Sequence, residues 1–314
     1  MEGETQGADS GVVIASGLAD SAFMKQSITA LAFALGTPFC LEAQEDLVFA
    51  NGSEWEVVSD GHQFAEGMAW DADGHFIFTD VPRAQLFRVD KATGEKTLLD
   101  GETGRANGIA FGPDGKLYGC SRGADAIARW DPATWKRDFI GKGGGSNDIA
   151  ILDDGTIFFT DPQNAQVWTI PAGSSERAVA QELPWKPNGI GLSIDQKTLL
   201  VAEFDSSTVH GFAINSKSHL TGRNRPAYRF AIPSNTLNRL DGMQPLKDGR
   251  LMIGTALGTQ IAPPVGGKGE LIVIPSPEGR SRCNYARISP DNTWLYTAYA
   301  KDVLRRKLKP GFGL

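Results

Sequence analysis

Six short segments of the chain share one pattern, and each begins with a carboxylate or amide side chain. The pattern is a polar lead residue, in most copies followed by glycine, then a few apolar residues, an aspartate turn and an apolar strand. The six lead residues are Glu66, Asn107, Asn147, Asn188, Asp241 and Asn284. Carboxylate and amide oxygens are hard ligands, and Ca²⁺ takes about six to eight such oxygens. The set therefore predicts a cation site, provided that the fold brings these residues together.

The same residues also have a purely structural explanation. Asn and Asp before Gly are common turn formers, because their side chains hydrogen-bond to their own backbone. Six polar residues in register, none of them basic, favour the cation site over this explanation. Without a cation, Glu66 and Asp241 would repel each other in a narrow channel.

The spacing of the copies predicts the elements that position these residues. In every copy an aspartate lies seven residues after the lead residue, and four of these aspartates precede glycine, which favours a two-residue hairpin turn. Gln196 and Asn292 replace that glycine in the fourth and sixth copies, where one extra residue predicts a longer hairpin. The copies begin 40 to 53 residues apart, with further strand-like runs between them.

A period of this length with several strands per copy is typical of a propeller blade. We therefore expect an all-β fold, a six-bladed β-propeller with four antiparallel strands per blade over residues 45–314. Residues 45–58 and 302–308 are the expected pair that closes the ring. The innermost strand of each blade starts beside the central channel, so the six lead residues should converge there.

Composition excludes several classes of protein. The 314 residues carry a net charge of −6, with 41% hydrophobic and 22% charged residues, an ordinary balance for a folded chain. A nucleic-acid partner is not expected, because binding a phosphate backbone needs clustered Lys and Arg. The three cysteines form no metal-binding spacing and no disulfide framework. Residues 45–314 contain no apolar run near the ~20 residues that a membrane span requires.

Residues 1–44 lie outside the repeat, and we expect a leader or signal-like segment there. Met24 and Lys25 precede an apolar run from Ile28 to Leu35, and Ala43 follows, which is the order of a secretory signal. An amphipathic helix packed on the domain is the alternative. Segment 24–43 thus leaves two locations open: export to the periplasm or the extracellular space, or the cytoplasm.

The motifs together resemble the regucalcin/gluconolactonase (senescence marker protein) family of six-bladed propellers. That family includes luciferin-regenerating enzyme and lies near diisopropyl fluorophosphatase. The resemblance covers about residues 55–308. It rests on five motifs: Glu66-Gly67, Ser146-Asn147-Asp148, Asp161-Pro162, Lys186-Pro187-Asn188-Gly189 and Leu240-Asp241-Gly242.

The resemblance implies a divalent cation, usually calcium, and hydrolysis of sugar lactones. The implied metal ligands are Glu66, Asn147, Asn188 and Asp241, and Asn147 is also an implied substrate contact. It further implies that Asp241 acts as base or nucleophile. Three departures leave the substrate open: Gly145 replaces an arginine of animal members, Arg122 stands where many bacterial members have histidine, and the segment after Asp161-Pro162 is short.

We therefore expect a Ca²⁺-dependent lactonase, a carboxylic ester hydrolase, with Mg²⁺, Mn²⁺ or Zn²⁺ as substitute cations. Asn107, Asn147 and Arg122 are the expected substrate contacts. His62, four residues before Glu66, could transfer protons, although a solvated loop histidine is the simpler interpretation. A phosphotriesterase and a non-catalytic ligand-binding propeller are the alternatives. The expected partner is a small molecule, and the expected state is a monomer or a weak dimer.

Overall fold

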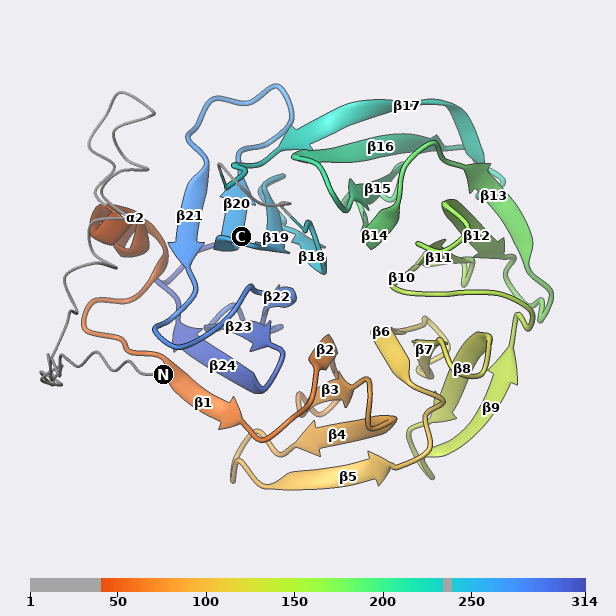
Figure 1. Ribbon diagram of the computed structural model, residues 1–314, viewed down its shortest axis with the longest axis horizontal. Helices are drawn as coiled ribbons and strands as arrows, with labels where there is room; N and C mark the ends of the chain where they lie inside the picture. The colour runs from red at the N-terminus through yellow and green to blue at the C-terminus, as the bar shows by residue number, and fades with distance from the viewer. Residues whose placement is uncertain (1–40, 234–238) are drawn as a thin grey trace, which may run out of the picture. The chain divides into compact units, whose positions relative to one another are not determined.

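The computed structural model describes residues 41–233 and 239–314 (Figure 1). The chain divides into residues 1–40 and a compact unit from Leu41 to Leu314, and most of the signal-like segment 24–43 lies outside the described residues. The compact unit contains six four-stranded antiparallel sheets set around a central axis. The predicted six-bladed β-propeller is thus confirmed.

Each blade runs from an innermost strand at the axis to an outermost strand at the rim. Blade 1 contains β2 (Ala65–Trp70), β3 (Phe76–Asp80), β4 (Gln85–Val89) and β5 (Lys96–Asp100). Blade 2 contains β6 (Ala106–Phe111), β7 (Leu117–Ser121), β8 (Ala126–Asp131) and β9 (Lys136–Ile140). Blade 3 contains β10 (Ile149–Ile151), β11 (Ile157–Asp161), β12 (Gln166–Ile170) and β13 (Ala178–Glu182).

The second half of the chain repeats this order. Blade 4 contains β14 (Pro187–Leu192), β15 (Thr198–Glu203), β16 (Thr208–Ile214) and β17 (Leu220–Arg229). Blade 5 contains β18 (Met243–Pro245), β19 (Leu251–Thr255), β20 (Gly258–Ala262) and β21 (Ile272–Pro275). Blade 6 contains β22 (Tyr285–Ile288), β23 (Trp294–Tyr299), β24 (Asp302–Lys307) and, as its outermost strand, β1 (Glu56–Ser59).

The ring closes by pairing the two ends of the propeller. Strand β1 is antiparallel to β24, with Glu56 opposite Arg305, as the sequence predicts. Helix α2 (Leu41–Val48) precedes this strand and packs beside β21. Its Gln44 Oε1 accepts a hydrogen bond of 2.9 Å from the Val273 amide. The boundary expected at residue 44 therefore falls inside a helix.

The aspartate turns differ in one respect from the expectation. In blade 1 the Gly74 amide donates to Asp71 O and the Asp71 amide donates to His75 O, so the loop has three residues. Only Gly74 has a positive φ (+83°), whereas the expected two-residue turn needs positive φ at two successive residues. The two-residue prediction is therefore wrong.

The longer hairpins of the fourth and sixth copies are confirmed. In blade 4 the Ser193 amide donates to Thr198 O, which spans one residue more than the equivalent bond in blade 1. Gln196 and Asn292 take the left-handed conformation with φ of +55° each.

The hydrophobic core lies between neighbouring blades. Ile77 and Leu86 of blade 1 pack with Ile109, Leu117 and Trp130 of blade 2, and all five are at most 1% exposed. Equivalent clusters join the other neighbouring blades. Because interiors packed this way are rigid, the innermost strands hold their spacing around the axis.

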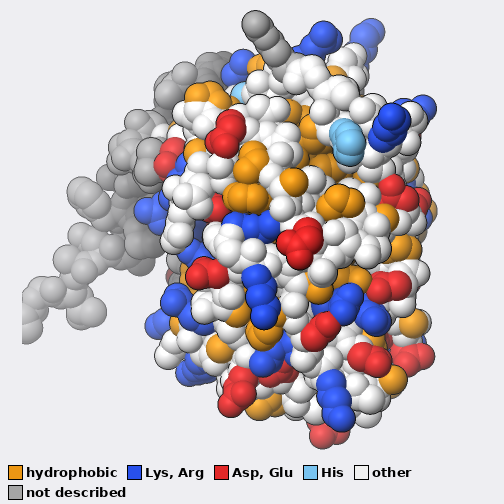
Figure 2. All heavy atoms as spheres, turned by 90° about the vertical axis from the view of Figure 1, so that its right-hand side faces the viewer, with side chains coloured by type: hydrophobic (Ala, Val, Ile, Leu, Met, Phe, Trp, Pro, Cys, Tyr) orange, Lys and Arg blue, Asp and Glu red, His pale blue; other side chains and the backbone are white. Residues whose placement is uncertain are grey.

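The cysteines, the helix and the surface charges of the described residues can be compared with the composition of the chain. Cys120 and Cys283 are buried free thiols. The helix of the described part is too short and too polar to cross a membrane. Figure 2 shows the side of the propeller that carries β9 and β13, where basic and acidic side chains are mixed rather than gathered by sign.

Candidate metal and active site

The structure gathers the six lead residues around the central channel. Each stands at or just before the start of an innermost strand (Figure 1), and these strands contact one another in the order β2, β6, β10, β14, β18, β22 and back to β2. All six residues are at most 8% exposed. We call this set the ring: Glu66, Asn107, Asn147, Asn188, Asp241 and Asn284.

The glycines that follow ring residues are required by the close approach of neighbouring blades. A Cβ atom on Gly67 would lie 2.2 Å from Asn107 O, and one on Gly189 would lie 2.0 Å from Asp241 O. The Gly242 amide donates to Asn284 O at 2.9 Å, so the backbone of one blade is bonded directly to the next. The glycine in the motif thus marks contact between blades.

Two buried carboxylates of the ring, Glu66 and Asp241, lie close enough to interact. Burial raises the pKa of Glu66 well above its usual range, and the charges of Asp241 and Asp148 raise it further. The Gly67 amide donates to Glu66 Oε2 at 3.0 Å. Such a pair gains stability from positive charge placed between or beside its members.

Arg282 supplies one such charge. Its Nη1 atom lies 2.9 Å from Asp241 Oδ2, and the two side chains are 20% and 5% exposed. Burial raises the pKa of Asp241 to about 6, while the Arg282 guanidinium opposes the rise. The Arg282 guanidinium also lies 5.8 Å from the ring centroid of Phe64 and 5.9 Å from that of Phe204.

Asp148 adds a third buried carboxylate next to the ring. Its oxygens accept hydrogen bonds from the amides of Ile149 (2.9 Å) and Ile190 (3.3 Å) and from the Tyr285 hydroxyl (3.3 Å). A Cβ atom on Gly108 would lie 2.0 Å from its Oδ1 atom. Burial raises the pKa of Asp148 to about 7. One side chain thus joins blades 2, 3, 4 and 6.

The ring residues fit a hard divalent cation. Their side chains offer carboxylate and amide oxygens, without the sulfur and imidazole ligands that softer metals prefer. The Asn284 Oδ1 atom is buried and has no hydrogen-bond partner among the described residues, which leaves it free for a ligand. Two carboxylates would balance the charge of such an ion.

Comparison with known proteins assigns the family. A sequence model of the SMP-30/gluconolactonase/LRE-like region matches residues 64–278, more than half of the chain. The chain belongs to the SMP-30/gluconolactonase/LRE-like family. The resemblance expected from the motifs is thereby confirmed.

Three relatives of the chain are distant from it in sequence. The gluconolactonase of Zymomonas mobilis is 26% identical over 250 residues, covering 67% of this chain and 70% of that protein. The structure of a gluconolactonase from Xanthomonas campestris superposes with a TM-score of 0.71 at 22% identity, covering 83% of this chain and 91% of that one. A calcium-binding regucalcin from Agrobacterium tumefaciens gives a TM-score of 0.68 at 16% identity, with 84% and 96% covered. These structures establish the fold.

Two further predicted residues of this SMP-30/gluconolactonase/LRE-like propeller, Arg122 and His62, are not members of the ring. Arg122 is exposed and follows Ser121, whose pairing with Ala106 places it at the ring end of blade 2. His62 is 5% exposed, so the solvated-loop interpretation is wrong. Its Nε2 atom lies 2.8 Å from Ser59 Oγ and its Nδ1 atom 3.3 Å from Asp80, and burial lowers its pKa. Packing and these contacts hold His62 in the interior of blade 1.

Two residues that sequence reasoning missed, Arg282 and Asp148, both had a signal in the repeat. Arg282 stands two positions before the ring residue Asn284, and Asp148 stands where four other copies have glycine. The family motif includes Asp148, but sequence reasoning gave it no role of its own.

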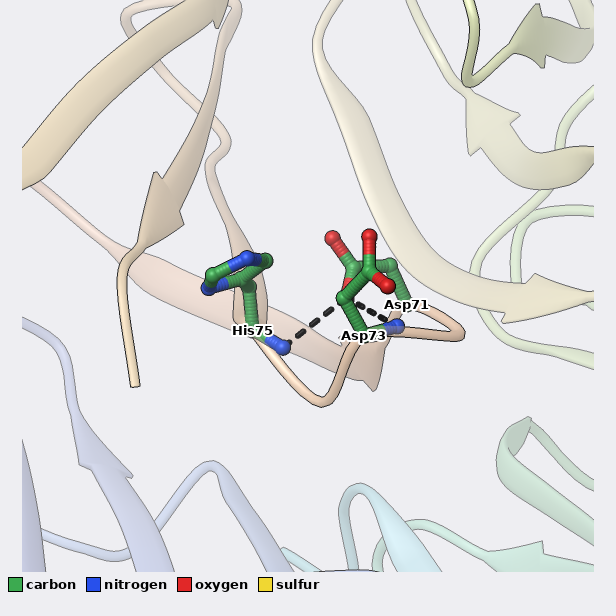
Figure 3. Close-up of side chains that lie close together, drawn as sticks. All are labelled: Asp71, Asp73 and His75. Atoms are coloured by element: carbon green, nitrogen blue, oxygen red, sulfur yellow. Dashed lines mark hydrogen bonds between the residues drawn. The ribbon is translucent and has the colours of Figure 1, made fainter. Parts of the chain in front are cut away.

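A second group of potential ligands lies away from the ring (Figure 3). The side chains of Asp71, Asp73 and His75 have ligand atoms within 4.8 Å of one another, in the turn that follows β2. Asp71 Oδ1 accepts hydrogen bonds from the amides of Asp73 (3.1 Å) and His75 (2.8 Å), and His75 Nδ1 accepts one from Lys91 N (3.2 Å). These bonds are those of an ordinary turn, and we assign no ion to the group.

A cavity at the other end of the channel also lies apart from the ring. It has a volume of about 440 Å³ and is lined by the far ends of the innermost strands, including Trp70, Phe111, Leu192 and Arg287. Tyr285 also lines this cavity, and its hydroxyl donates to Asp148. The predicted site of this family member is therefore the buried ring and not this cavity.

Proposed function

We propose that this protein hydrolyses lactones at the ring with the help of a divalent cation, Ca²⁺ in the first place. Glu66, Asn147, Asn188 and Asp241 would hold the ion. The observation that carries the proposal is the burial of two carboxylates, Glu66 and Asp241, in register with four amides at one end of the channel. Membership of the family and the gluconolactonase relative support it.

The bound cation would polarise the lactone carbonyl and favour negative charge on its oxygen. Mg²⁺, Mn²⁺ or Zn²⁺ could take its place. The protein itself would position the reactants and move the proton. Asn107, Asn147 and Arg122 would contact the substrate.

Asp241 would act as general base. Its carboxylate accepts a proton from a water molecule as the water oxygen bonds to the carbonyl carbon. The C–O bond within the lactone then breaks, and Asp241 passes the same proton to the departing oxygen. The product is an open-chain hydroxy acid. Arg282 donates to Asp241 Oδ2 and so fixes the orientation of the carboxylate. Direct attack by Asp241 on the carbonyl is the second form of this mechanism.

A substrate panel tests the proposal. The purified protein would be assayed on lactones and phosphotriesters with Ca²⁺, Mg²⁺, Mn²⁺, Zn²⁺ or a chelator. We expect lactone hydrolysis above the spontaneous rate, dependent on the cation. Hydrolysis of phosphotriesters alone, or of neither class despite cation binding, would contradict it in favour of one of the two alternatives. The names of the relatives give no support to either alternative.

A further inference from the structure

Basic residues recur two positions before the ring residues. Arg105, Lys186, Arg239 and Arg282 occupy this position in blades 2, 4, 5 and 6. These residues lie on the loops that lead into the innermost strands, at the ring end of the channel. We call the four residues the basic collar.

Two members of the collar converge on one aromatic ring. Phe204 follows β15, and its amide donates to Lys186 O at 3.0 Å. The Lys186 ammonium lies 4.6 Å from the Phe204 ring centroid, and the Arg282 guanidinium lies 5.9 Å from the same centroid. Positive charges from blades 4 and 6 thus meet within 6 Å of one side chain.

The charges of the collar are poorly balanced by the protein. Lys186, Arg105 and Arg239 have no ion-pair partner within residues 41–233 and 239–314. Among the same residues Arg282 pairs only with Asp241, which would also be a ligand of the cation. A cation bound to Asp241 would offset part of its negative charge, so that less of this charge would remain to balance the Arg282 guanidinium. The loaded site would then offer positive charge at its mouth.

We propose that Lys186 and Arg282 form an anion subsite above the ring, to which Arg105 and Arg239 add positive charge at the same end of the channel, and that the substrate is a lactone bearing a carboxylate or phosphate group. This inference rests on the proposed function. The lactone carbonyl would lie at the ring, and the anionic group would lie among the collar residues. Guanidinium and ammonium groups are the usual partners of both anions.

The test compares neutral and anionic lactones on the Ca²⁺-loaded protein. Gluconolactone is neutral, glucarolactone carries a carboxylate, and gluconolactone 6-phosphate carries a phosphate. We expect kcat/KM to be at least about tenfold higher for one anionic lactone than for gluconolactone, and to fall with ionic strength for the anionic lactones only. Comparison of glucarolactone with gluconolactone 6-phosphate identifies which of the two anions the subsite prefers.

Lys186→Gln should lower the ratio of anionic to neutral kcat/KM by about fivefold, the contribution of a partly exposed ion pair. Lys217→Gln is the matched control, because Lys217 is an exposed residue of the same blade, in the hairpin between β16 and β17 at the end away from the ring. The ratio of anionic to neutral kcat/KM in Lys217→Gln should equal that of the wild type. Equal rates on neutral and anionic lactones, or an unchanged ratio in Lys186→Gln, would overturn the subsite.

A binding measurement separates this inference from the proposed function. Calorimetry with gluconate 6-phosphate, glucarate and gluconate needs no turnover, and we expect tighter binding of an anion-bearing sugar acid, weakened in Lys186→Gln. If that binding is found while no lactone is hydrolysed, the proposed function fails and the subsite stands. If lactones are hydrolysed but all three acids bind alike, the subsite is wrong.

Discussion

The guanidinium of Arg282 in blade 6 lies 2.9 Å from the carboxylate of Asp241 in blade 5. Both residues lie at the ring end of the channel, where Asp241, Glu66 and Asp148 place three carboxyl groups in the interior. Buried like charges destabilise a fold unless they are paired or protonated. The ion pair with Arg282 therefore helps the ring to be acidic and still folded, and it fixes the orientation of the Asp241 carboxylate.

Asp241→Asn should abolish lactone hydrolysis while the propeller still folds and binds a cation. Asn is nearly isosteric and keeps one carbonyl oxygen, but it cannot accept the proton or attack the carbonyl. Loss of a general base costs about 10²–10⁴-fold in rate. The rate would be measured at saturating Ca²⁺, with calorimetry to confirm that the ion is bound.

Asn188→Ala is the contrast for that experiment. It should weaken cation binding, and excess Ca²⁺ should restore part of the activity. Wild-type turnover in Asp241→Asn with the ion bound would make Asp241 a ligand only and move the base elsewhere.

Gly189→Ala should destabilise the ring itself. The added Cβ would meet the backbone oxygen of Asp241 at 2.0 Å, and backbone cannot move aside as a side chain can. We expect a loss of about 3 kcal/mol or more in the free energy of unfolding, at the upper end of the cost of overpacking. Urea denaturation measures the loss.

Gly101→Ala provides the control, because its Cβ would meet only Leu98 Cδ2, at 3.8 Å. Its unfolding midpoint should match the wild type. Equal stability of the two variants would show that the blades are not in tight contact at Gly189.

The sequence is sufficient to predict the six-bladed architecture, because the repeat specifies the blades. Lead residues, aspartate turns and their spacing specify one hairpin per blade, and six hairpins with their flanking strands close only as a ring. Convergence of the lead residues follows from that topology, and so does pairing of β1 with β24. The role of each ring residue stays a prediction, since geometry alone does not assign ligands.

The pair of Arg282 with Asp241 could not be predicted in the same way. Arg282 lies in the loop before β22, and its side-chain direction depends on Phe64 and Phe204 from two other blades. Asp148 poses the same problem, because its partners Ile190 and Tyr285 are far away in the chain. The sequence does not decide the turn type, because Asp-Gly also suits a three-residue loop, in which only the glycine needs a positive φ.

The contribution of His62 to stability should fall as the pH falls. Burial, aided by the charge of Lys96, holds the pKa of folded His62 below its ordinary value of 6.5. Below pH 6.5 the unfolded chain therefore binds a proton that the folded protein does not, and unfolding is favoured. Between pH 7.5 and 5.5 the wild type should lose stability relative to His62→Gln, as measured by urea denaturation at both values.

The comparison with His62→Gln is needed because Glu66, Asp148 and Asp241 have raised pKa values and act in the opposite sense. These three carboxyl groups contribute equally to the pH dependence of the wild type and of His62→Gln, so their effect cancels in the difference. Parallel pH dependence in wild type and variant would contradict the account of His62.

A chain that starts at Leu41 should fold and bind Ca²⁺ like the full-length protein, because residues 1–40 contain no blade motif. A chain that starts at Ala50 should melt at a lower temperature. It would lack α2, and with it the Gln44 bond to Val273 and the ion pair of Glu45 with Arg306 (2.6 Å). Thermal melting of the three proteins tests this. Aggregation of the chain from Leu41 would instead mean that the apolar run from Ile28 to Leu35 packs on the propeller.

The cation requirement is the centre of the proposed function, and removal and return of Ca²⁺ test it most directly. Gluconolactone hydrolysis, corrected for the spontaneous rate, would be followed before chelation, after removal of chelator and ion, and after Ca²⁺ is restored. We predict loss of activity without the ion and full recovery with it, accompanied by a higher melting temperature in the loaded protein. Undiminished hydrolysis by protein shown to be free of metal would contradict the account.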